Sequence, residues 1–357
     1  MPVIHGRSLT RREYLARVGD IGQCFGIRAM QFASGKAAMV RGYEVDTAGG
    51  LRFFVSESKG FDLYDLSYKG VRFSFFTKAG YSSPWITEEQ GMAYRNNLGA
   101  GFLYTAGLSN VGGPVEEGGF YHNVHGNLKN TPAENVSWGS VWEGDDCKLK
   151  LSADVRDSAF FGRNLLMHRE IEAGVGEKRF FIRDTIENQG FDDEQIMLLY
   201  HMNLGYPVLD RDAMLIAPVV KEEPLSEHTR LNDPDYARMI SPIDNNVEYL
   251  HALTLGADAD GRTLCAAYNA QLGLGLYVRY NVNRLKYLIE WKCMSSGDYA
   301  LGMLPSTCLP NGREANRLGG DLHTLAPFEH FENLLEIGII EGDRERDACL
   351  ESIRKMH

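Results

Sequence analysis

The 357-residue sequence lacks paired cysteines, long apolar runs and a recognisable export signal. Its cysteines are widely scattered and form neither C-x-x-C nor a zinc-type spacing, which indicates reduced thiols rather than a disulfide framework: Cys24, Cys147, Cys265, Cys293, Cys308 and Cys349. No apolar stretch approaches the roughly 20 residues that a membrane span requires. The first residues, MPVIHGRSLTRREYL, contain no apolar signal core. We therefore expect a cytoplasmic protein with no membrane partner.

Positive charge is also scarce. The 37 Lys and Arg residues are outnumbered by 48 Asp and Glu residues, so the formal net charge is −11. Nucleic-acid binding requires clustered Lys and Arg to neutralise phosphates, and no such cluster is present. The sequence also lacks a P-loop, a G-x-S-x-G elbow, an H-E-x-x-H motif and a G-x-G-x-x-G turn that opens a helix. The charge balance therefore excludes a nucleic-acid partner. The missing motifs exclude the commonest classes of nucleotide-binding protein and hydrolase.

Short runs rich in β-branched and aromatic residues dominate the chain from about residue 37 onward. Gly, Asp and Asn bound these runs, as is typical of strands: LRFFVSES, GVRFSFFTK, CKLKLSADV, RFFIRDTIEN, LCAAYNA and LGLYVRYNV. Within one run, Phe180 and Ile182 alternate with Arg179 and Arg183, which predicts a half-buried strand. No change of composition divides the chain, so we predict an all-β fold with one large antiparallel domain over residues 37–343.

The two ends of the chain and one internal segment differ from this pattern. Thr10 and Glu13 have the spacing of a capping box, which predicts a short helix over residues 9–18 within an N-terminal appendage of residues 1–36. Residues 344–357 form a C-terminal tail that is compatible with a short helix. Residues 221–246 are polar and contain prolines, and they predict a long loop of the kind that often carries function.

Two histidines lie in settings that suggest a polar site. His201 follows the apolar run MLLY, and Asn203 would point to the same side of a strand. His125 lies in the loop-like run YHNVHGNL, beside Gly126, which permits a close approach of backbone. Histidine can exchange a proton near neutral pH, so two of them suggest acid–base chemistry. The alternatives are a hydrogen-bonded core histidine for His201 and an exposed loop histidine for His125.

Other polar residues are weaker candidates. His122 and His125 have an H-x-x-H spacing, but the run is not helical and no third ligand lies nearby, so no metal site is predicted. Trp291 is either a core residue or a platform for the apolar face of a sugar. Glu290 and Lys292 alternate with it and are candidates for substrate binding, with a solvated strand face as the alternative. Arg95 precedes two asparagines in AYRNNLG, where a solvated loop arginine is the alternative.

The order of several motifs resembles the aldose 1-epimerase, or galactose mutarotase-like, superfamily and is most similar to its DUF4432 branch. The matching pieces reach from about residue 20 to 340: GGLRFFVSESKGFDLYDLSYKG, GAGFLYTAGLSNVGGP, HGN, FGRNLLMHREIEAGVGEKRFFIRDTIENQG, LLYHMNLGYPVLD and IEWKCMSSGDYALGMLPSTCLPNGREANR. The resemblance implies a β-supersandwich, a small-molecule carbohydrate as ligand, and no metal or organic cofactor.

The resemblance also implies roles for individual residues. In characterised mutarotases a histidine protonates the ring oxygen and a glutamate removes the proton of the anomeric hydroxyl. His201 matches the acid, His125 matches the second histidine, and Arg95 is a looser match to a substrate-binding arginine. We expect Asn203, His122, Glu290 and Lys292 to contribute further substrate contacts.

Leu304 is the main departure from the family pattern. The sequence reads GMLP where a pattern like GLEP, with the catalytic glutamate, is expected, and leucine cannot accept a proton. A nearby carboxylate (Glu290, Asp298 or Glu314) or a histidine (His122 or His125) could take over. From the resemblance we expect an aldose 1-epimerase-like protein that binds a monosaccharide or sugar derivative, with interconversion of its anomers by general acid–base catalysis as the expected activity. Two alternatives stay open, a non-catalytic sugar-binding protein and an interaction module without a pocket. If the chain oligomerises, a homodimer is the expected form.

Overall fold

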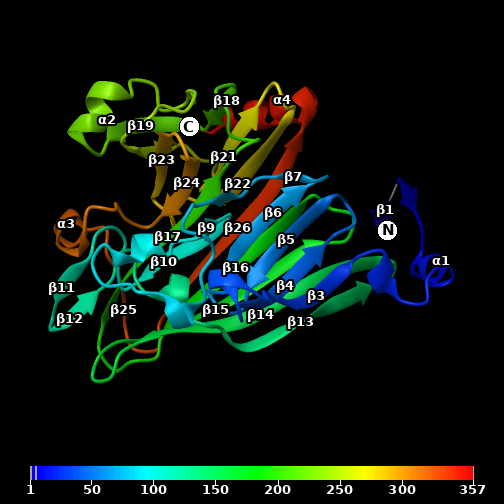
Figure 1. Ribbon diagram of the computed structural model, residues 1–357, viewed down its shortest axis with the longest axis horizontal. Coiled ribbons are helices and arrows are strands. Elements are labelled where there is room, and N and C mark those ends of the chain that lie inside the picture. Colours follow the sequence, from blue (N-terminus) through cyan, green and yellow to red (C-terminus); the bar gives the residue numbers. More distant parts are fainter. Residues whose placement is uncertain (1, 5, 357) are drawn as a thin grey trace.

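The largest sheet of the molecule is antiparallel and has eight strands. The computed structural model describes residues 2–4 and 6–356. In spatial order the strands of this sheet are β13 (Glu134–Glu143), β14 (Asp146–Ser158), β15 (Asn164–Gly174), β16 (Arg179–Asn188), β26 (His330–Glu341), β22 (Leu274–Asn281), β21 (Arg262–Asn269) and β18 (Ala213–Ile216). In Figure 1 the sheet extends from β13 near the bottom of the view to β21 and β22 near the top. The alternation predicted for β16 is confirmed, because Phe180 and Ile182 are buried whereas Arg179 and Arg183 are exposed.

Two smaller antiparallel sheets accompany it. The seven-stranded sheet consists of β10 (Leu103–Leu108), β17 (Glu194–Leu204), β24 (Asp298–Ser306), β23 (Tyr287–Ser295), β20 (Tyr249–Leu255) and β19 (Val219–Pro224), with β25 (His323–Leu325) paired to β17. The five-stranded sheet consists of β3 (Gly26–Gln31), β4 (Arg41–Asp46), β5 (Leu51–Ser56), β6 (Leu63–Tyr68) and β7 (Val71–Arg72). Three short pairs complete the strands: β1 (Val3–Ile4) with β2 (Arg7–Ser8), β8 (Phe75–Phe76) with β9 (Ala100–Gly101), and β11 (Val115–Glu117) with β12 (Phe120–His122).

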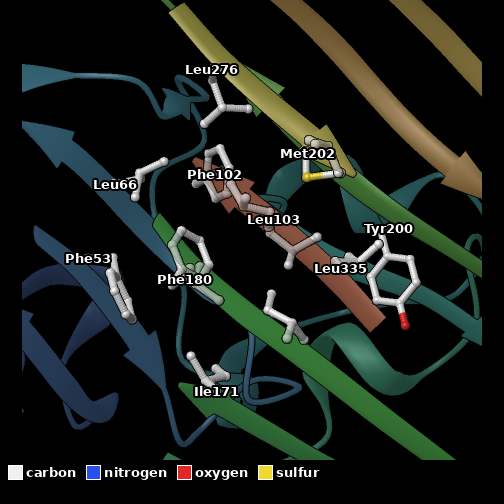
Figure 2. Packing of buried hydrophobic residues seen from close by; sticks show 14 of the residues in the cluster. Phe53, Leu66, Phe102, Leu103, Ile171, Phe180, Tyr200, Met202, Leu276 and Leu335 are labelled. Atoms are coloured by element: carbon white, nitrogen blue, oxygen red, sulfur yellow. The ribbon is translucent and has the colours of Figure 1, made fainter. Parts of the chain in front are cut away.

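The main hydrophobic core lies between the large sheet and the two smaller ones (Figure 2). Phe53 of β5 stacks on Phe180 of β16 with ring centroids 4.7 Å apart. Tyr200 and Met202 of β17 belong to the same buried cluster as Leu335 of β26. Full burial of a large apolar side chain contributes about 1.5–3 kcal/mol, so this shared core holds the sheets together. Large antiparallel sheets packed face to face confirm the predicted all-β supersandwich.

A buried ion network crosses this core. Arg169 of β15, which is fully buried, donates to both carboxylate oxygens of Asp184 at 2.8 and 2.7 Å and to Asp62 Oδ1 at 2.6 Å. It also donates to Thr105 Oγ1 of β10 at 2.9 Å, and the Tyr200 hydroxyl donates to Asp184 Oδ2 at 2.7 Å. The network joins the large sheet to β10 and β17, the two strands that carry much of the site described below.

The helices are few and short. They are α1 (Arg11–Leu15), α2 (Glu227–Asn232), α3 (Arg313–Gly319) and α4 (Gly342–Ile353), with 3-10 turns η1 (Ile21–Gln23), η2 (Gly35–Ala37), η3 (Pro84–Ile86), η4 (Ala93–Asn96) and η5 (Leu128–Asn130). The capping box of Thr10 and Glu13 is present at α1, and the predicted tail helix is α4. Among the residues described, no helix has both the length and the apolar character of a membrane span.

Two segments differ from the sequence prediction. Residues 221–246 are not a continuous loop, because β19 extends to Pro224 and α2 follows, with Ser226 as its N-cap. The N-terminal appendage is not only helical, because β3 pairs with β4 within the five-stranded sheet. The sequence did not reveal β19 because its four central residues, Val220 to Glu223, are all exposed and so give no alternation of apolar and polar residues.

Candidate functional site

A cleft of about 640 Å³ lies on the face of the seven-stranded sheet that is turned away from the main core. Strand alternation divides β17 between the two sides. Leu199, His201 and Asn203 line the cleft, whereas Tyr200 and Met202 point into the core. The prediction that His201 and Asn203 share one face of a buried strand is therefore confirmed.

The side chain of Asn203 fixes the tautomer of His201. Asn203 Nδ2 donates to the carbonyl oxygens of Gly101 and His201, both at 3.1 Å. Its Oδ1 consequently faces His201 Nδ1 at 2.5 Å and can only accept. In the neutral imidazole the proton therefore lies on Nδ1, and Nε2 carries a free lone pair. Within the described chain Nε2 has no hydrogen-bond partner, and the ring lines the cleft.

His125 has the opposite tautomer. The backbone N–H of Gly112 donates to His125 Nδ1 at 3.3 Å, so this nitrogen is the acceptor and the proton of the neutral ring lies on Nε2. The ring of His125 lies edge-on to that of His201, with centroids 5.7 Å apart and planes at 81°. Two imidazoles that are far apart in the sequence thus meet in one cleft, one with a free acceptor and the other with a free donor.

The backbone around His125 is held on several sides. Its φ is 58°, a left-handed conformation that is unusual for a residue with a side chain and costs of order 1–3 kcal/mol. Its N–H donates to Gly112 O at 3.0 Å, and its carbonyl accepts from Gly107 N at 3.1 Å. The buried ammonium of Lys129 donates to the carbonyls on either side, Val124 at 2.8 Å and Gly126 at 2.6 Å. These contacts offset the backbone strain and position the ring.

Burial keeps both imidazoles neutral. It lowers the pKa of His201 to about 3, although the hydrogen bond to Asn203 opposes this shift. Burial, together with the neighbouring His201 and Lys129, holds the pKa of His125 well below its usual range. At neutral pH neither ring carries a charge, so the deduced tautomers are the forms that meet a ligand.

Aromatic side chains form the walls around His201. Tyr104 stacks on its imidazole with ring centroids 4.3 Å apart, and Trp291 lies 5.5 Å away at 68°. The indole N–H of Trp291 donates to Glu248 Oε2 at 2.7 Å, which fixes the ring plane. A fixed indole face at the edge of a polar cleft is a suitable platform for the apolar face of a sugar ring.

Leu304 also lines the cleft and is 3% exposed. It is the β-bridge partner of Ile289, so two aliphatic side chains occupy the part of the wall where a catalytic glutamate was expected. The carboxylates that line the cleft are instead Glu223 and Glu248. Among the described residues, neither lysine nor arginine lines the cleft.

Four predicted substrate-binding residues lie outside this lining. Glu290 and Lys292 point to the opposite face of β23, because they alternate with Ile289 and Trp291, which line the cleft. Burial raises the pKa of Glu290 well above its usual range. Arg95 is exposed on η4, and His122 is buried on β12. For Glu290 and Lys292 the sequence reasoning assigned the wrong side of the strand.

Sequence reasoning missed two contributors to the cleft. Tyr104 lies in a strand that is buried throughout, LYTAGL, where a tyrosine looks like any core residue. Glu248 ends an irregular segment before β20 and has no periodic pattern around it. The register between strands reveals Tyr104, because it is the direct partner of His201 across β10 and β17. No comparable sequence signal exists for Glu248.

Comparison with known proteins agrees with this architecture. A family model described as a domain of unknown function, DUF4432, matches residues 37–339. A candidate aldose 1-epimerase from Klebsiella pneumoniae subsp. pneumoniae superposes with a TM-score of 0.89 at 20% identity, over 93% of this chain and 88% of that one. No curated protein matches the sequence.

More distant solved structures share the fold. A galactose mutarotase-like protein from Clostridium acetobutylicum gives a TM-score of 0.59 at 15% identity, over 88% of this chain and 98% of that one. A galactose 1-epimerase from Lactobacillus acidophilus gives 0.58 at 14% identity, over 88% and 99%. The chain therefore belongs to the DUF4432 family, and its fold is that of the aldose 1-epimerases and galactose mutarotase-like proteins.

Proposed function

We propose that the protein interconverts the anomers of an aldose, using His201 and His125 as its acid–base pair. The observation that carries this proposal is that two neutral imidazoles with opposite tautomers face one cleft, 5.7 Å apart. The galactose 1-epimerase named above has the same fold, which makes the chemistry a reasonable one for this cleft. The resemblance alone would assign His201 as the acid, whereas its free Nε2 lone pair favours the role of base.

In this mechanism His201 Nε2 accepts the proton of the anomeric hydroxyl while the bond between C1 and the ring oxygen breaks. The hydroxyl becomes strongly acidic as the C1 carbonyl forms, so a weak base suffices. The ring oxygen gains negative charge and accepts a hydrogen bond from the Nε2–H of His125. The proton held by His201 then passes to that oxygen, which leaves the open-chain aldehyde and both rings neutral. Rotation about the C1–C2 bond and reversal of these steps form the other anomer.

The lining of the cleft favours an uncharged sugar or an amino sugar. Glu248 contributes negative charge, Glu223 is paired with Lys221 at 2.8 Å, and the described lining offers no cationic partner for a phosphate or carboxylate. A buried anion without a partner is costly, so phosphorylated sugars and uronates are disfavoured. Trp291 and Leu304 offer apolar surface for one face of a pyranose.

The test is anomer exchange measured by NMR on a panel that contains glucose, galactose, glucosamine and galacturonate. We expect acceleration for at least one neutral or amino sugar and the weakest effect for the uronate. Each positioned group contributes about 10²–10⁴-fold, so His201→Gln and His125→Gln should each lower kcat/KM by at least about 10²-fold. His168→Gln is the matched control, because His168 is exposed and pairs with Asp154 on another surface. Exchange that survives both cleft substitutions would contradict the proposal.

Leu304 supports a second candidate, a sugar-binding protein without catalysis. Its aliphatic side chain lines the cleft where a base was expected. Calorimetry that detects sugar binding, combined with no exchange for any sugar of the panel, would favour this candidate over the first.

A further inference from the structure

A second polar cluster lies beneath the cleft, on the opposite face of the seven-stranded sheet. It contains His251 of β20, Glu290 of β23 and Asp233, which follows α2. His251 and Glu290 are direct partners across β20 and β23. One ligand atom from each of the three residues lies within 4.8 Å of the others. His251 and Glu290 are buried, and the side chain of Asp233 is 10% exposed. The proposed sugar chemistry does not use any of these side chains.

Glu290 has no partner that explains its burial. Its exposed fraction is 0%, and neither carboxylate oxygen has a hydrogen-bond partner among the described residues. A buried polar group without a partner costs about 1–3 kcal/mol, and a charged group costs more. Protonation would remove the cost of the charge, but it would leave the carboxyl oxygens and the added O–H donor without partners. The unpartnered side chain therefore points to a bound species within the cluster.

The surroundings of His251 resemble the support of a metal-ligating histidine. Its Nδ1 lies 2.7 Å from Glu222 Oε1, while its Nε2 lies 3.0 Å from Asp233 Oδ2. A carboxylate on the far nitrogen is the usual partner of a histidine that binds a metal through the other. Two ligands of a tetrahedral zinc ion at about 2.1 Å are roughly 3.4 Å apart. An ion would thus replace the proton between Nε2 and Oδ2 after a shift of about 0.4 Å.

Lys292 is the competing cation. Its buried ammonium lies 2.8 Å from Asp233 Oδ1, and it donates to the carbonyls of Asp235 at 3.0 Å and Arg238 at 2.9 Å. These three acceptors use all three of its N–H donors. Lys292 therefore neutralises Asp233 but makes no hydrogen bond to Glu290, so both carboxylate oxygens of Glu290 still lack a donor among the described residues.

We propose that Asp233, His251 and Glu290 bind a divalent first-row transition ion, and the donor set of one imidazole and two carboxylates fits zinc best. The ion would fasten the segment after α2 to β20 and β23. Its role is structural, because Glu290 faces away from Ile289 and Trp291, its neighbours on the cleft side. The same segment lies between Leu225 and Glu248, two residues of the cleft lining, so the ion would stabilise one wall of the cleft.

The test is titration calorimetry of the chelator-treated full chain with Zn²⁺. We expect one ion per chain. Glu290→Gln keeps the shape of the side chain but removes its charge, and we expect at least about 100-fold weaker binding. Glu222→Gln removes only the support of His251 and should weaken binding about 10–100-fold. His168→Gln removes a histidine–carboxylate contact at 2.7 Å on an exposed face and should change the affinity less than about twofold.

Two outcomes would overturn the proposal. One is wild-type protein that holds no stoichiometric zinc, which would leave Lys292 as the resident cation. The other is equal affinity of the wild type and Glu290→Gln. Should Glu290→Gln fail to fold, Co²⁺ loaded into the wild type gives an independent reading: we expect d–d bands of nitrogen and oxygen ligation. Thiolate charge-transfer bands would instead place the ion at cysteines and refute the site.

Discussion

The buried, neutral state of His201 makes the stability of the protein depend on pH. Burial lowers the pKa of this imidazole to about 3, whereas an unperturbed histidine has a pKa of about 6.5. Between these values the unfolded chain binds a proton at this residue and the folded chain does not, so acidification favours unfolding. The stability contributed by the neutral ring is therefore complete above about pH 6.5 and is lost as the pH falls towards about 3.

The size of the effect follows from the difference in pKa. Each unit corresponds to about 1.4 kcal/mol, so the loss reaches about 3 kcal/mol at pH 4.5 and approaches about 5 kcal/mol below pH 3. His201→Gln removes the titrating group. We expect the free energy of unfolding of the wild type to fall by about 3 kcal/mol more than that of His201→Gln between about pH 8 and pH 4.5.

Urea denaturation at both pH values measures this double difference, which cancels any constant cost of the substitution. His168→Gln, at an exposed position, serves as the control and should follow the wild type. Parallel losses for the wild type and His201→Gln, within about 0.5 kcal/mol, would refute the reasoning. An NMR titration in which the His201 Cε1 proton shifts near pH 6.5 would refute it directly.

Three further predictions concern the framework of the cleft. Arg169→Met leaves Asp62 and Asp184 buried without their counter-charge, so urea denaturation should show a free energy of unfolding that is lower by about 3–5 kcal/mol. A loss below about 1 kcal/mol would contradict a stabilising role for this ion network. Gly126→Ala places a Cβ 2.1 Å from Gly107 O at a φ of +69°, so we expect a lower thermal unfolding midpoint and a loss of sugar binding in calorimetry. Unchanged values would contradict the close contact between the backbones of Gly126 and Gly107. Leu304→Glu introduces a carboxylate into the cleft wall. A carboxylate with an ordinary pKa of about 4.3 is a stronger base than His201, whose pKa burial lowers to about 3, so NMR should show anomer exchange at least about tenfold faster. An unchanged rate would contradict the placement of position 304 beside the anomeric hydroxyl.

Much of the fold was predictable because strand alternation is a local signal. The run at residues 179–188 alternates between apolar and polar residues and forms β16 with the predicted faces. The capping box at Thr10 and Glu13 likewise acts within one turn. β19 was missed because four of its six residues are exposed, so its sequence VVKEEP has no apolar face to detect.

The site was only partly predictable, since it depends on which face of each strand meets the cleft. His201 and Asn203 were placed together because they lie two residues apart on one strand. Glu290 and Lys292 also lie two residues apart, but the sequence does not reveal that Trp291, rather than they, faces the cleft. The tautomers of His125 and His201 depend on Gly112 and Asn203, contacts that only the folded chain defines.

Strand β23 has one face in the cleft and the other in the buried cluster, so its register decides which side chains enter each of them. Successive residues enter the cleft and the buried cluster in turn, and β23 is joined to β24 by the tight turn at residues 296–297. A slip of one position would present Glu290 and Lys292 to a sugar and force the indole of Trp291 among buried charges. A single-residue insertion or deletion in this hairpin would thus exchange the side chains of the cleft and of the buried cluster at once. A substitution on one face of the strand could not compensate for both changes.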